Sequence, residues 1–453
     1  MTTPGHVAIV GASLAGITTA RELRSAGYAG VLTLIGDEPH MPYDRPPLSK
    51  AFLGEDVDVS LAASDEIIEL RAEWVLGRPA TGLGSDADGR HAVILDDSRI
   101  SADVVVLATG ARARPLPGCP DLAGIHTLRT LDDAHRLRSS LARARRLVVL
   151  GAGFIGAEVA STARALGVDV TIVEVSATPL AAALGDTIAE HCTALHAANG
   201  VQLLTGIGVR EIVGEERVTG VLLTDGTRLP ADAVVVGIGA IPNTEWLVHP
   251  QIDATNGFRT DAHGRTGVVG VFAVGDCANT FDPHCAAHHR SEHWTSATTQ
   301  ARVVAAAITA THPPGASEAT GESTALAAPY FWSHQYGHQL QFAGYRLPTD
   351  TVHVVEGDLD SGPVVAIYRR ASVTVGVFSR DNPRLFTRYR KQIERTMRET
   401  ARDAAAGAAV HTAALEAGRP SAELDEDLRS YRRGHLDSTE LLRRTTSRYR
   451  TRC

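Results

Sequence analysis

Two glycine-rich turns of the dinucleotide-binding type occur on this one chain, at Gly11–Gly16 and at Gly151–Gly156. The second is a complete G-x-G-x-x-G that follows an apolar strand, Leu147–Leu150, and opens a helical pattern. In such a turn the first glycine makes the bend, the second lets the backbone approach a pyrophosphate, and the third lets helix pack closely on strand. Each turn belongs to its own βαβ unit. The chain is therefore expected to be an α/β protein with two Rossmann-like nucleotide-binding domains.

The residues after each turn indicate how a ribose is bound. Beyond the second turn, the strand VTIVE ends in Glu174, at the spacing of about 20 residues typical of a ribose-binding acid. No arginine follows it directly, so NADH is expected over NADPH. In the first copy Ser13 replaces the middle glycine, and Gly36 stands where Glu174 would align, with Asp37 and Glu38 beyond. A small hydroxylic side chain can still clear a phosphate, although a plain glycine-rich turn is the alternative there.

Length and charge limit the function classes. The 453 residues suggest about three domains, and the net charge of −8 gives no reason to expect nucleic acid as a partner. The chain enters its first strand without a basic leader, and it has no long apolar run, so we expect a cytoplasmic protein without a membrane span.

The spacing and positions of the cysteines limit the possible mechanism. They form no C-x-x-C pair, which favours a reducing compartment, and none occurs before Cys119. Flavoenzymes that reduce disulfides need a reactive cysteine close to the flavin. Electrons are therefore expected to leave without a protein thiol relay.

An apolar strand ends in Gly-Asp within GVFAVGDCAN, Gly270 to Asn279. Asp276 is suited to bind the ribityl hydroxyls of a flavin, because a carboxylate accepts hydrogen bonds from hydroxyls well. The alternative is that Asp276 caps the next helix.

Several ordered motifs over residues 5–397 resemble those of the FAD-containing ferredoxin reductases of bacterial oxygenase systems, of the putidaredoxin reductase and biphenyl-type dioxygenase kinds. They are GDEPHMPYDRPPLSKAFL from Gly36, GAGFIGAE, ATGARARPLPG from Ala108, LRTLDDA from Leu128, VGDCA, EHW from Glu292 and PYFWSHQYG from Pro329. The resemblance implies a glutathione-reductase-like pair of nucleotide-binding domains and a smaller α+β C-terminal domain. It also implies electron transfer from NADH through FAD to an iron-sulfur ferredoxin that serves a haem monooxygenase or a Rieske dioxygenase, by a monomer or a homodimer.

The resemblance also implies the domain order. The expected parts are an FAD domain at 1–116 and 243–322, an NAD domain at 117–242, a C-terminal domain at 323–399 and an atypical tail at 400–453. The breaker-rich stretch Thr311–Pro329 is a fair boundary. The segments HQLQFAGYRL and VVAIYRRASVTVGVF alternate as antiparallel strands do. The tail is interpreted as a loosely helical or disordered appendage, with a partner tether or an oligomer-stabilising arm as alternatives.

By resemblance, the cofactor contacts fall on two sets of residues. Those for FAD are Gly11, Ser13, Ala15, Gly16, Asp37, Arg45, Lys50, Ala80, Arg129, Asp276, His293 and Trp294, and those for NAD are Gly151, Gly153, Phe154, Ile155, Gly156, Glu158, Glu174 and Gly239. For Trp294, core packing is the alternative.

Lysine usage adds an independent argument about Lys50. The chain carries 44 Lys plus Arg, yet lysine occurs only at Lys50 and Lys391. A lysine kept where arginine is the default cation suggests a site in which a guanidinium does not fit. The resemblance places Lys50 beside the flavin, paired with Glu158, as the catalytic residues; the alternative is a surface lysine left by drift.

The histidines raise the question of a metal site, and one of them departs from the resembled family. His284, His288, His289 and His293 include helix-spaced pairs, but they lack cysteine or carboxylate partners at ligand spacing, so no metal is expected. His334 stands where the resembled family usually has an acid.

The segment from Gly362 to Glu399 has nine Lys plus Arg against three acids. We predict that an acidic ferredoxin docks there on Arg384, Arg388 and Arg390, with a solvated helix face as the alternative. Two rival functions stay open. One is an NADH oxidase or CoA-disulfide reductase, disfavoured by the missing early cysteine. The other is a partner-binding flavoprotein resembling apoptosis-inducing factor.

Overall fold

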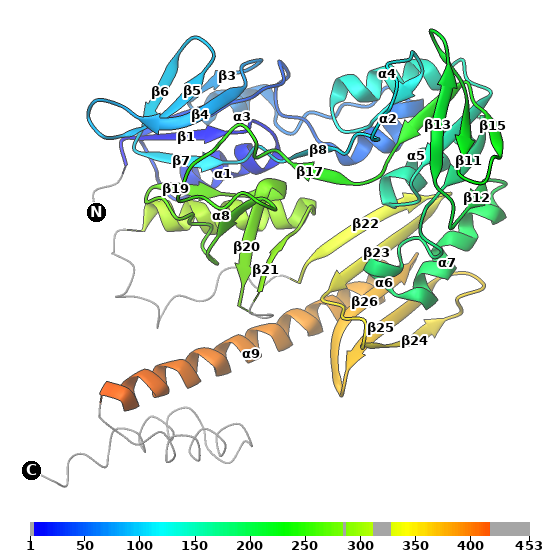
Figure 1. Ribbon diagram of the computed structural model, residues 1–453. Helices are drawn as coiled ribbons and strands as arrows, with labels where there is room; N and C mark the ends of the chain where they lie inside the picture. The colour runs from blue at the N-terminus through cyan, green and yellow to red at the C-terminus, as the bar shows by residue number, and fades with distance from the viewer. Residues whose placement is uncertain (1–3, 284–286, 311–327, 417–453) are drawn as a thin grey trace, which may run out of the picture. The chain divides into compact units, whose positions relative to one another are not determined.

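The computed structural model describes residues 4–283, 287–310 and 328–416. Its compact part, which ends at Arg390, contains two five-stranded parallel sheets and one five-stranded antiparallel sheet (Figure 1). Two parallel sheets, each with a fingerprint turn after a central strand, confirm the expected α/β fold with two Rossmann-like units.

The first parallel sheet has the order β19-β7-β1-β2-β3. Alternate residues of its central strand face two layers, because successive side chains of a strand point to opposite faces. Val7 and Ile9 pack with helices α1 and α8, while Ala8 and Val10 pack with a three-stranded antiparallel sheet, β4-β5-β6. The bounds are β1 His6–Val10, β2 Val31–Ile35, β3 Ala72–Val75, β4 Ala80–Ser85, β5 His91–Leu95, β6 Arg99–Ala102, β7 Val104–Leu107, β19 Val271–Ala273, α1 Leu14–Ser25 and α8 Trp294–Thr309.

The second parallel sheet repeats this layering with the order β12-β11-β10-β16-β9. Val149 faces helices α4 and α5, whereas Val148 and Leu150 face the antiparallel sheet β13-β14-β15. The bounds are β9 Ile125–His126, α4 Leu131–Leu141, β10 Arg146–Leu150, α5 Phe154–Ala165, β11 Asp169–Val173, β12 Gln202–Leu204, β13 Val209–Gly214, β14 Val218–Leu223, β15 Arg228–Pro230 and β16 Ala233–Val236.

Two short strands carry the chain between these units. β8, Ala111–Ala113, pairs antiparallel with β17, Ala240–Pro242, and Figure 1 shows the pair running from the first sheet toward the second. The chain thus leaves the first unit through β8 and returns to it through β17, before β19 of the first sheet.

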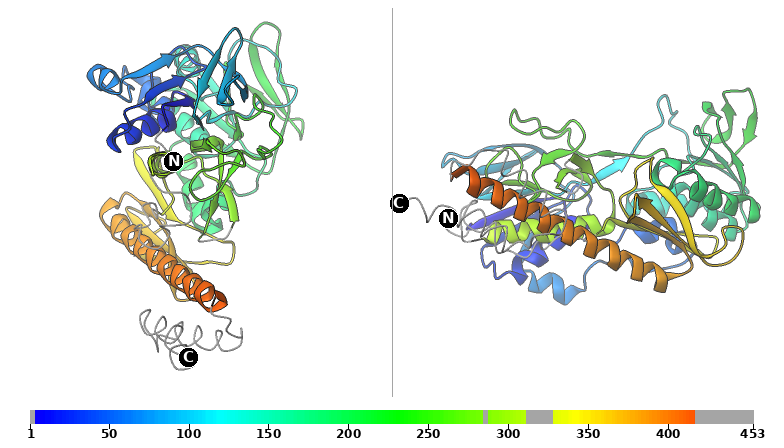
Figure 2. Two further views of the ribbon diagram at one scale, coloured as in Figure 1. Left: turned by 90° about the vertical axis from the view of Figure 1, so that its left-hand side faces the viewer. Right: turned by 90° about the horizontal axis from the view of Figure 1, so that it is seen from below.

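The antiparallel sheet has the order β22-β23-β26-β25-β24, and it is drawn yellow to orange in Figure 2. Leu340, Phe342 and Tyr368 of this sheet pack on helices α6 and α7 of the second unit. The bounds are α6 Ala181–Leu184, α7 Asp186–Ala198, β22 Tyr330–Gln335, β23 His338–Gly344, β24 Thr351–Gly357, β25 Val364–Arg370 and β26 Val373–Arg380.

Helix α9, Pro383–Glu416, begins in the compact part and continues past residue 399, where the tail was expected to begin. Residues 311–327 and 417–453, which hold most of the expected boundary and most of the tail, lie outside the described residues. The remaining elements are η1 Pro46–Ser49, α2 Ala51–Gly54, α3 Ser64–Glu69, β18 Phe258–Thr260, η2 Gly275–Cys277, β20 Ala278–Asp282 and β21 Ala287–Arg290.

Candidate functional site

The first glycine of each turn is required by the backbone. Gly11 has φ +121° and Gly151 has φ +100°, in the region that side chains rarely adopt. A Cβ atom would lie 2.0 Å from a carbonyl oxygen at Gly11 and 2.3 Å from one at Gly151. The third glycines are as constrained, because a Cβ at Gly16 or Gly156 would lie 1.9 Å or 2.1 Å from the carbonyl oxygen of its own turn.

The middle position is different. A Cβ at Gly153 would meet no described atom within 4 Å, so the space over this turn is open. The N-cap of α5 is Gly153, which has no side chain, and the N-cap of α1 is Ser13, whose hydroxyl makes no cap hydrogen bond in the described structure. The first amides of both helices are therefore available for phosphate oxygens. This arrangement fits the pyrophosphates of FAD and NAD.

Glu174 follows β11, and hydrogen bonds from two backbone N–H groups hold its carboxylate. Its Oε2 accepts a hydrogen bond from the Ala152 N–H at 2.9 Å, and its Oε1 accepts one from the Ser176 N–H at 2.8 Å. The carboxylate thus stands beside the second turn, as expected for a ribose-binding acid.

In the first unit the two candidate acids have separate surroundings. Glu38 is bound on both oxygens, by Arg45 at 2.7 Å and by the Tyr43 hydroxyl at 2.5 Å. Asp37 is exposed, and its Oδ1 accepts a hydrogen bond from the Glu38 N–H. Asp37 is therefore the better placed of the two acids for a ribose.

A polar network joins three of the residues expected to bind FAD. Arg45 donates to the backbone oxygen of Arg129 at 2.5 Å, and Arg129 lies 2.6 Å from the Asp276 carboxylate. Asp276 lies inside η2, whose N-cap is Val274, so it does not cap the helix that follows.

The Lys50 ammonium lies 2.7 Å from Glu158 Oε2. Glu158 is on α5, two residues after the third glycine of the second turn, and it is 1% exposed. A buried carboxylate is stable only when it is paired and hydrogen-bonded, and this one also accepts from the Ser49 hydroxyl at 2.5 Å and the Ser333 hydroxyl at 2.6 Å. Residues from both nucleotide-binding units and from the antiparallel sheet therefore meet at one carboxylate.

The segment around His293 packs on strand β22, which also carries Ser333. The His293 ring stacks on Phe331 at 5.1 Å, and burial lowers the pKa of His293, so the ring is neutral at pH 7. Trp294 begins α8, is 36% exposed and donates to Asp44 at 2.9 Å, which argues against plain core packing. Phe331 also packs on Phe154 at 4.7 Å.

Three other residues expected to bind a cofactor lie at or next to the start of a strand or helix. Ala80 is the first residue of β4, Gly239 has φ +102° just before β17, and Ile155 is 46% exposed at the start of α5.

Residues 5–301 match the family model described as pyridine nucleotide-disulphide oxidoreductase, and residues 330–415 match the one described as reductase C-terminal. The chain belongs to the pyridine nucleotide-disulphide oxidoreductase family. It is 39% identical over 406 residues to the rhodocoxin reductase of Rhodococcus erythropolis, which covers 88% of this chain and 92% of the relative.

Other relatives agree. The ferredoxin reductase component of a chlorobenzene dioxygenase from Cupriavidus sp. is 40% identical over 395 residues, which covers 86% of this chain and 92% of the relative. The crystal structure of a covalent putidaredoxin reductase–putidaredoxin complex superposes with a TM-score of 0.78 at 33% identity, over 86% of this chain and 93% of the other. The chain is thus an oxidoreductase that uses FAD and NAD(H).

Position 334 has a histidine in place of an acid, and the backbone of this histidine faces Glu158. Its N–H lies 3.3 Å from Glu158 Oε1, and desolvation of the ring and the nearby Lys50 ammonium lower the pKa of His334. A neutral imidazole therefore stands where the resemblance implies a negative charge.

Within the described residues, no group of three histidine, cysteine or acidic side chains could hold a metal ion. His284 and Cys285 lie outside that part of the chain. None of the helices in the described ranges is long and apolar enough to span a membrane.

Sequence reasoning missed four contributors to the centre, listed with their partners: Ser49 and Ser333 on Glu158, Asp44 on Trp294, and Phe331 on His293. All four lie in motifs that carried the resemblance, but their partners are distant in sequence. Only the folded chain shows which of these side chains meet.

The basic segment carries less surface charge than its sequence suggests. Arg380 is 5% exposed and donates to the Gly362 carbonyl, and Arg370 is paired with Asp350. Arg384 and Arg388 are exposed on α9, whereas the Arg390 guanidinium lies over the Tyr330 ring at 4.5 Å from its centroid. Part of the positive charge of this segment is therefore structural, because Arg380 is buried and Arg370 is paired.

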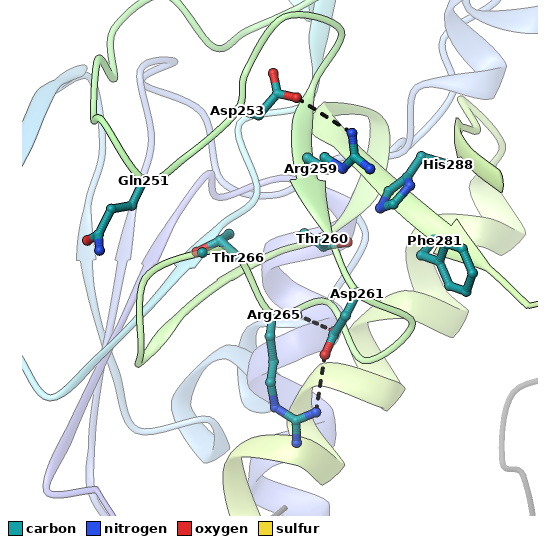
Figure 3. A pocket seen from close by; sticks show the side chains of 10 residues that line it. Gln251, Asp253, Arg259, Thr260, Asp261, Arg265, Thr266, Phe281 and His288 are labelled. Atoms are coloured by element: carbon teal, nitrogen blue, oxygen red, sulfur yellow. Dashed lines mark hydrogen bonds and ion pairs between the residues drawn. The ribbon is translucent and has the colours of Figure 1, made fainter. Parts of the chain in front are cut away.

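A surface hollow of about 420 Å³ is lined mainly by the segment 251–267, which contains β18, together with Phe281 of β20 and His288 of β21 (Figure 3). Its two guanidiniums are paired, Arg259 with Asp253 and Arg265 with Asp261. It shares no residue with the predicted cofactor contacts, and its charges compensate one another, so we assign it no part in the chemistry.

Proposed function

We propose that this chain transfers electrons from NADH, through FAD, to an iron-sulfur ferredoxin that serves an oxygenase. The observation that carries the proposal is the buried Lys50–Glu158 pair, formed where both nucleotide-binding units meet the antiparallel sheet. The relatives named as ferredoxin reductases of oxygenase systems give the direction of electron flow.

Each turn would hold one nucleotide. The α1 turn and Asp37 would bind the FAD pyrophosphate and ribose, with Arg129 and Asp276 toward the flavin end. The α5 turn and Glu174 would bind NADH. The residues around Asp276 would hold an FAD, which when bound would supply hydride acceptance and one-electron release that side chains do not provide.

The residues of the chain contribute charge and position. Lys50 supplies one positive charge, and Glu158 holds that ammonium in one place through a 2.7 Å ion pair. A fixed cation costs no reorganisation when negative charge develops beside it. His293 is neutral and stacked, so it adds shape rather than charge.

The described cysteines do not favour the disulfide-reducing alternative. Cys192 and Cys277 are buried, and burial raises the pKa of both thiols, so neither is a ready thiolate. Cys119 is half-buried and its pKa is also raised by burial.

We further propose that the ferredoxin docks at the first turns of α9 through Arg384 and Arg388, which are exposed. Exposed arginines steer an acidic partner by long-range attraction. Arg390 is set apart from this pair because it packs on Tyr330, so its replacement would disturb packing as well as charge.

The test of the activity uses purified flavoprotein, NADH, a panel of ferredoxins and cytochrome c. Cytochrome c reduction that depends on an added ferredoxin supports the proposal. Peroxide or water as the main product would support the oxidase alternative, and slow turnover with a long-lived charge-transfer band would support the partner-binding flavoprotein.

The docking test compares Arg384→Glu/Arg388→Glu with Arg210→Glu/Arg228→Glu, a matched pair of exposed arginines on β13 and β15. The first pair should raise the KM for ferredoxin and flatten its salt dependence, with NADH-driven ferricyanide reduction unchanged. Equal effects of the two pairs would place docking elsewhere. We expect a cytoplasmic enzyme. We also expect a monomer or a homodimer, and a sedimentation measurement distinguishes these two oligomeric states.

A further inference from the structure

Glu158 is held from two sides. Its Oε2 faces the PPLSK segment and accepts from Ser49 and Lys50, whereas its Oε1 faces strand β22 and accepts from the Ser333 hydroxyl at 2.6 Å and the His334 N–H at 3.3 Å. The Ser333 contact is the shorter of the two on Oε1. Ser333 therefore fixes the oxygen that Lys50 does not reach.

The direction of this hydrogen bond is set by a third side chain. Gln335 donates from Nε2 to Ser333 Oγ at 3.1 Å, and both residues are buried, at 1% and 0% exposure. A serine hydroxyl has one proton, so an oxygen that accepts from Gln335 keeps that proton for Glu158. The buried order is Gln335 to Ser333 to Glu158, and Lys50 donates to Glu158 from the opposite side.

We propose that Ser333 is a positioning residue for the reaction at the flavin, acting through Glu158 on the Lys50 ammonium. This inference rests on the proposed function for the identity of the reaction. Without Ser333, Oε1 would keep only the longer bond from the His334 N–H, at 3.3 Å, against rotation about the terminal torsion, which is broad and roughly two-fold. Ser333 removes that freedom, so the C-terminal sheet sets where the positive charge of Lys50 stands.

The geometry favours this role over plain packing. A buried serine needs no charged partner, and Ser379 on strand β26, two strands away from β22 in the same sheet, is such a case: it is also 0% exposed, and its Oγ accepts from the Asn382 N–H at 3.2 Å. Ser333 instead makes a charge-assisted bond to the carboxylate that holds Lys50.

The experiment uses the FAD-loaded enzyme and four variants, Ser333→Ala, Ser333→Thr, Ser333→Cys and Ser379→Ala, each also made with Lys50→Met. Three quantities are measured: the rate constant of flavin reduction at saturating NADH by anaerobic stopped flow, the Kd for NADH, and the flavin midpoint potential. Ser333→Ala should slow reduction by about tenfold and lower the potential, with the Kd changed by less than about twofold.

Ser333→Thr should restore the wild-type rate, Ser333→Cys should give a smaller loss in the same direction, and Ser379→Ala should change neither rate nor potential. With Lys50→Met present, Ser333→Ala should have no further effect, because the charge that it positions is gone. An unchanged rate in Ser333→Ala, or the same loss with and without Lys50, overturns the proposal. If Ser333→Ala does not fold, the Ser333→Cys pair decides by the same two criteria.

Failure of the proposed function would look different. If reduced enzyme passes electrons to no ferredoxin while Ser333→Ala still slows flavin reduction through Lys50, the acceptor is wrong and the positioning role stands.

Discussion

The two nucleotide-binding units have the same three layers, yet they differ at the middle position of the turn and on the helix that follows it. The backbone carbonyls allow no Cβ at the first or third glycine of either turn, whereas the middle position is Ser13 in one unit and Gly153, with open space over it, in the other. Two of the three glycines are therefore required by the fold, whereas our proposal gives the middle one to the ligand.

A second difference lies on the helices. When the two turns are aligned, Thr18 of α1 occupies the position of Glu158 on α5, and both are buried. Glu158 reaches Lys50 in the other unit, at 2.7 Å. The second helix therefore supplies the carboxylate of the ion pair that joins the two units.

The largest expected effect comes from a first glycine. Gly11→Ala combines a positive φ with a Cβ 2.0 Å from a carbonyl oxygen, which should cost more than about 3 kcal/mol of unfolding free energy. Gly153→Ala, where the space is open, should leave the unfolding transition nearly unchanged. Thermal unfolding of the two variants checks this contrast, and equal losses would mean that the middle glycine also serves the fold.

The next effect tests the residue pair that joins the units. Lys50→Met should slow flavin reduction by NADH about 100-fold and lower the flavin potential, because an ammonium near the ring favours the electron-rich form. Lys391→Met, which removes the second lysine of the chain on α9, is the matched control and should behave as wild type. Should both variants leave rate and potential unchanged, Lys50 is structural at most.

A smaller effect is expected when the acids that follow strands β11 and β2 are changed. Glu174→Ala with Val175→Arg should reduce the preference for NADH over NADPH by about tenfold, because the repelling carboxylate is replaced by a cation next to it. The comparison variant is Asp37→Ala in the first unit, which should alter FAD retention and leave the coenzyme preference as it was. The ratio of kcat/KM values for the two coenzymes measures both, and equal use of both coenzymes by the wild type would remove the role of Glu174.

Spacing along the chain was enough to predict the two turns, Glu174 and the parallel sheets, because each depends on residues within one βαβ unit. The resemblance supplied the pairing of Lys50 with Glu158. Neither source predicted that Ser333 binds Glu158, since 175 positions separate them and packing alone brings them together. Burial was equally hidden: Arg380 looks like surface charge in the sequence but is 5% exposed.

The smallest effect comes from exchanging the middle residues. The Ser13 side chain makes no cap hydrogen bond in the described structure, so Ser13→Gly should change the unfolding free energy by less than about 1 kcal/mol and FAD affinity by less than about threefold. Gly153→Ser should fold normally in its open space and raise the Kd for NADH severalfold, because its hydroxymethyl group enters the path of the pyrophosphate. Isothermal titration with NADH and fluorimetric FAD release measure the two affinities. If Gly153→Ser binds NADH as tightly as wild type, the open space above the turn is not where the pyrophosphate approaches, and the middle position is neutral in both units.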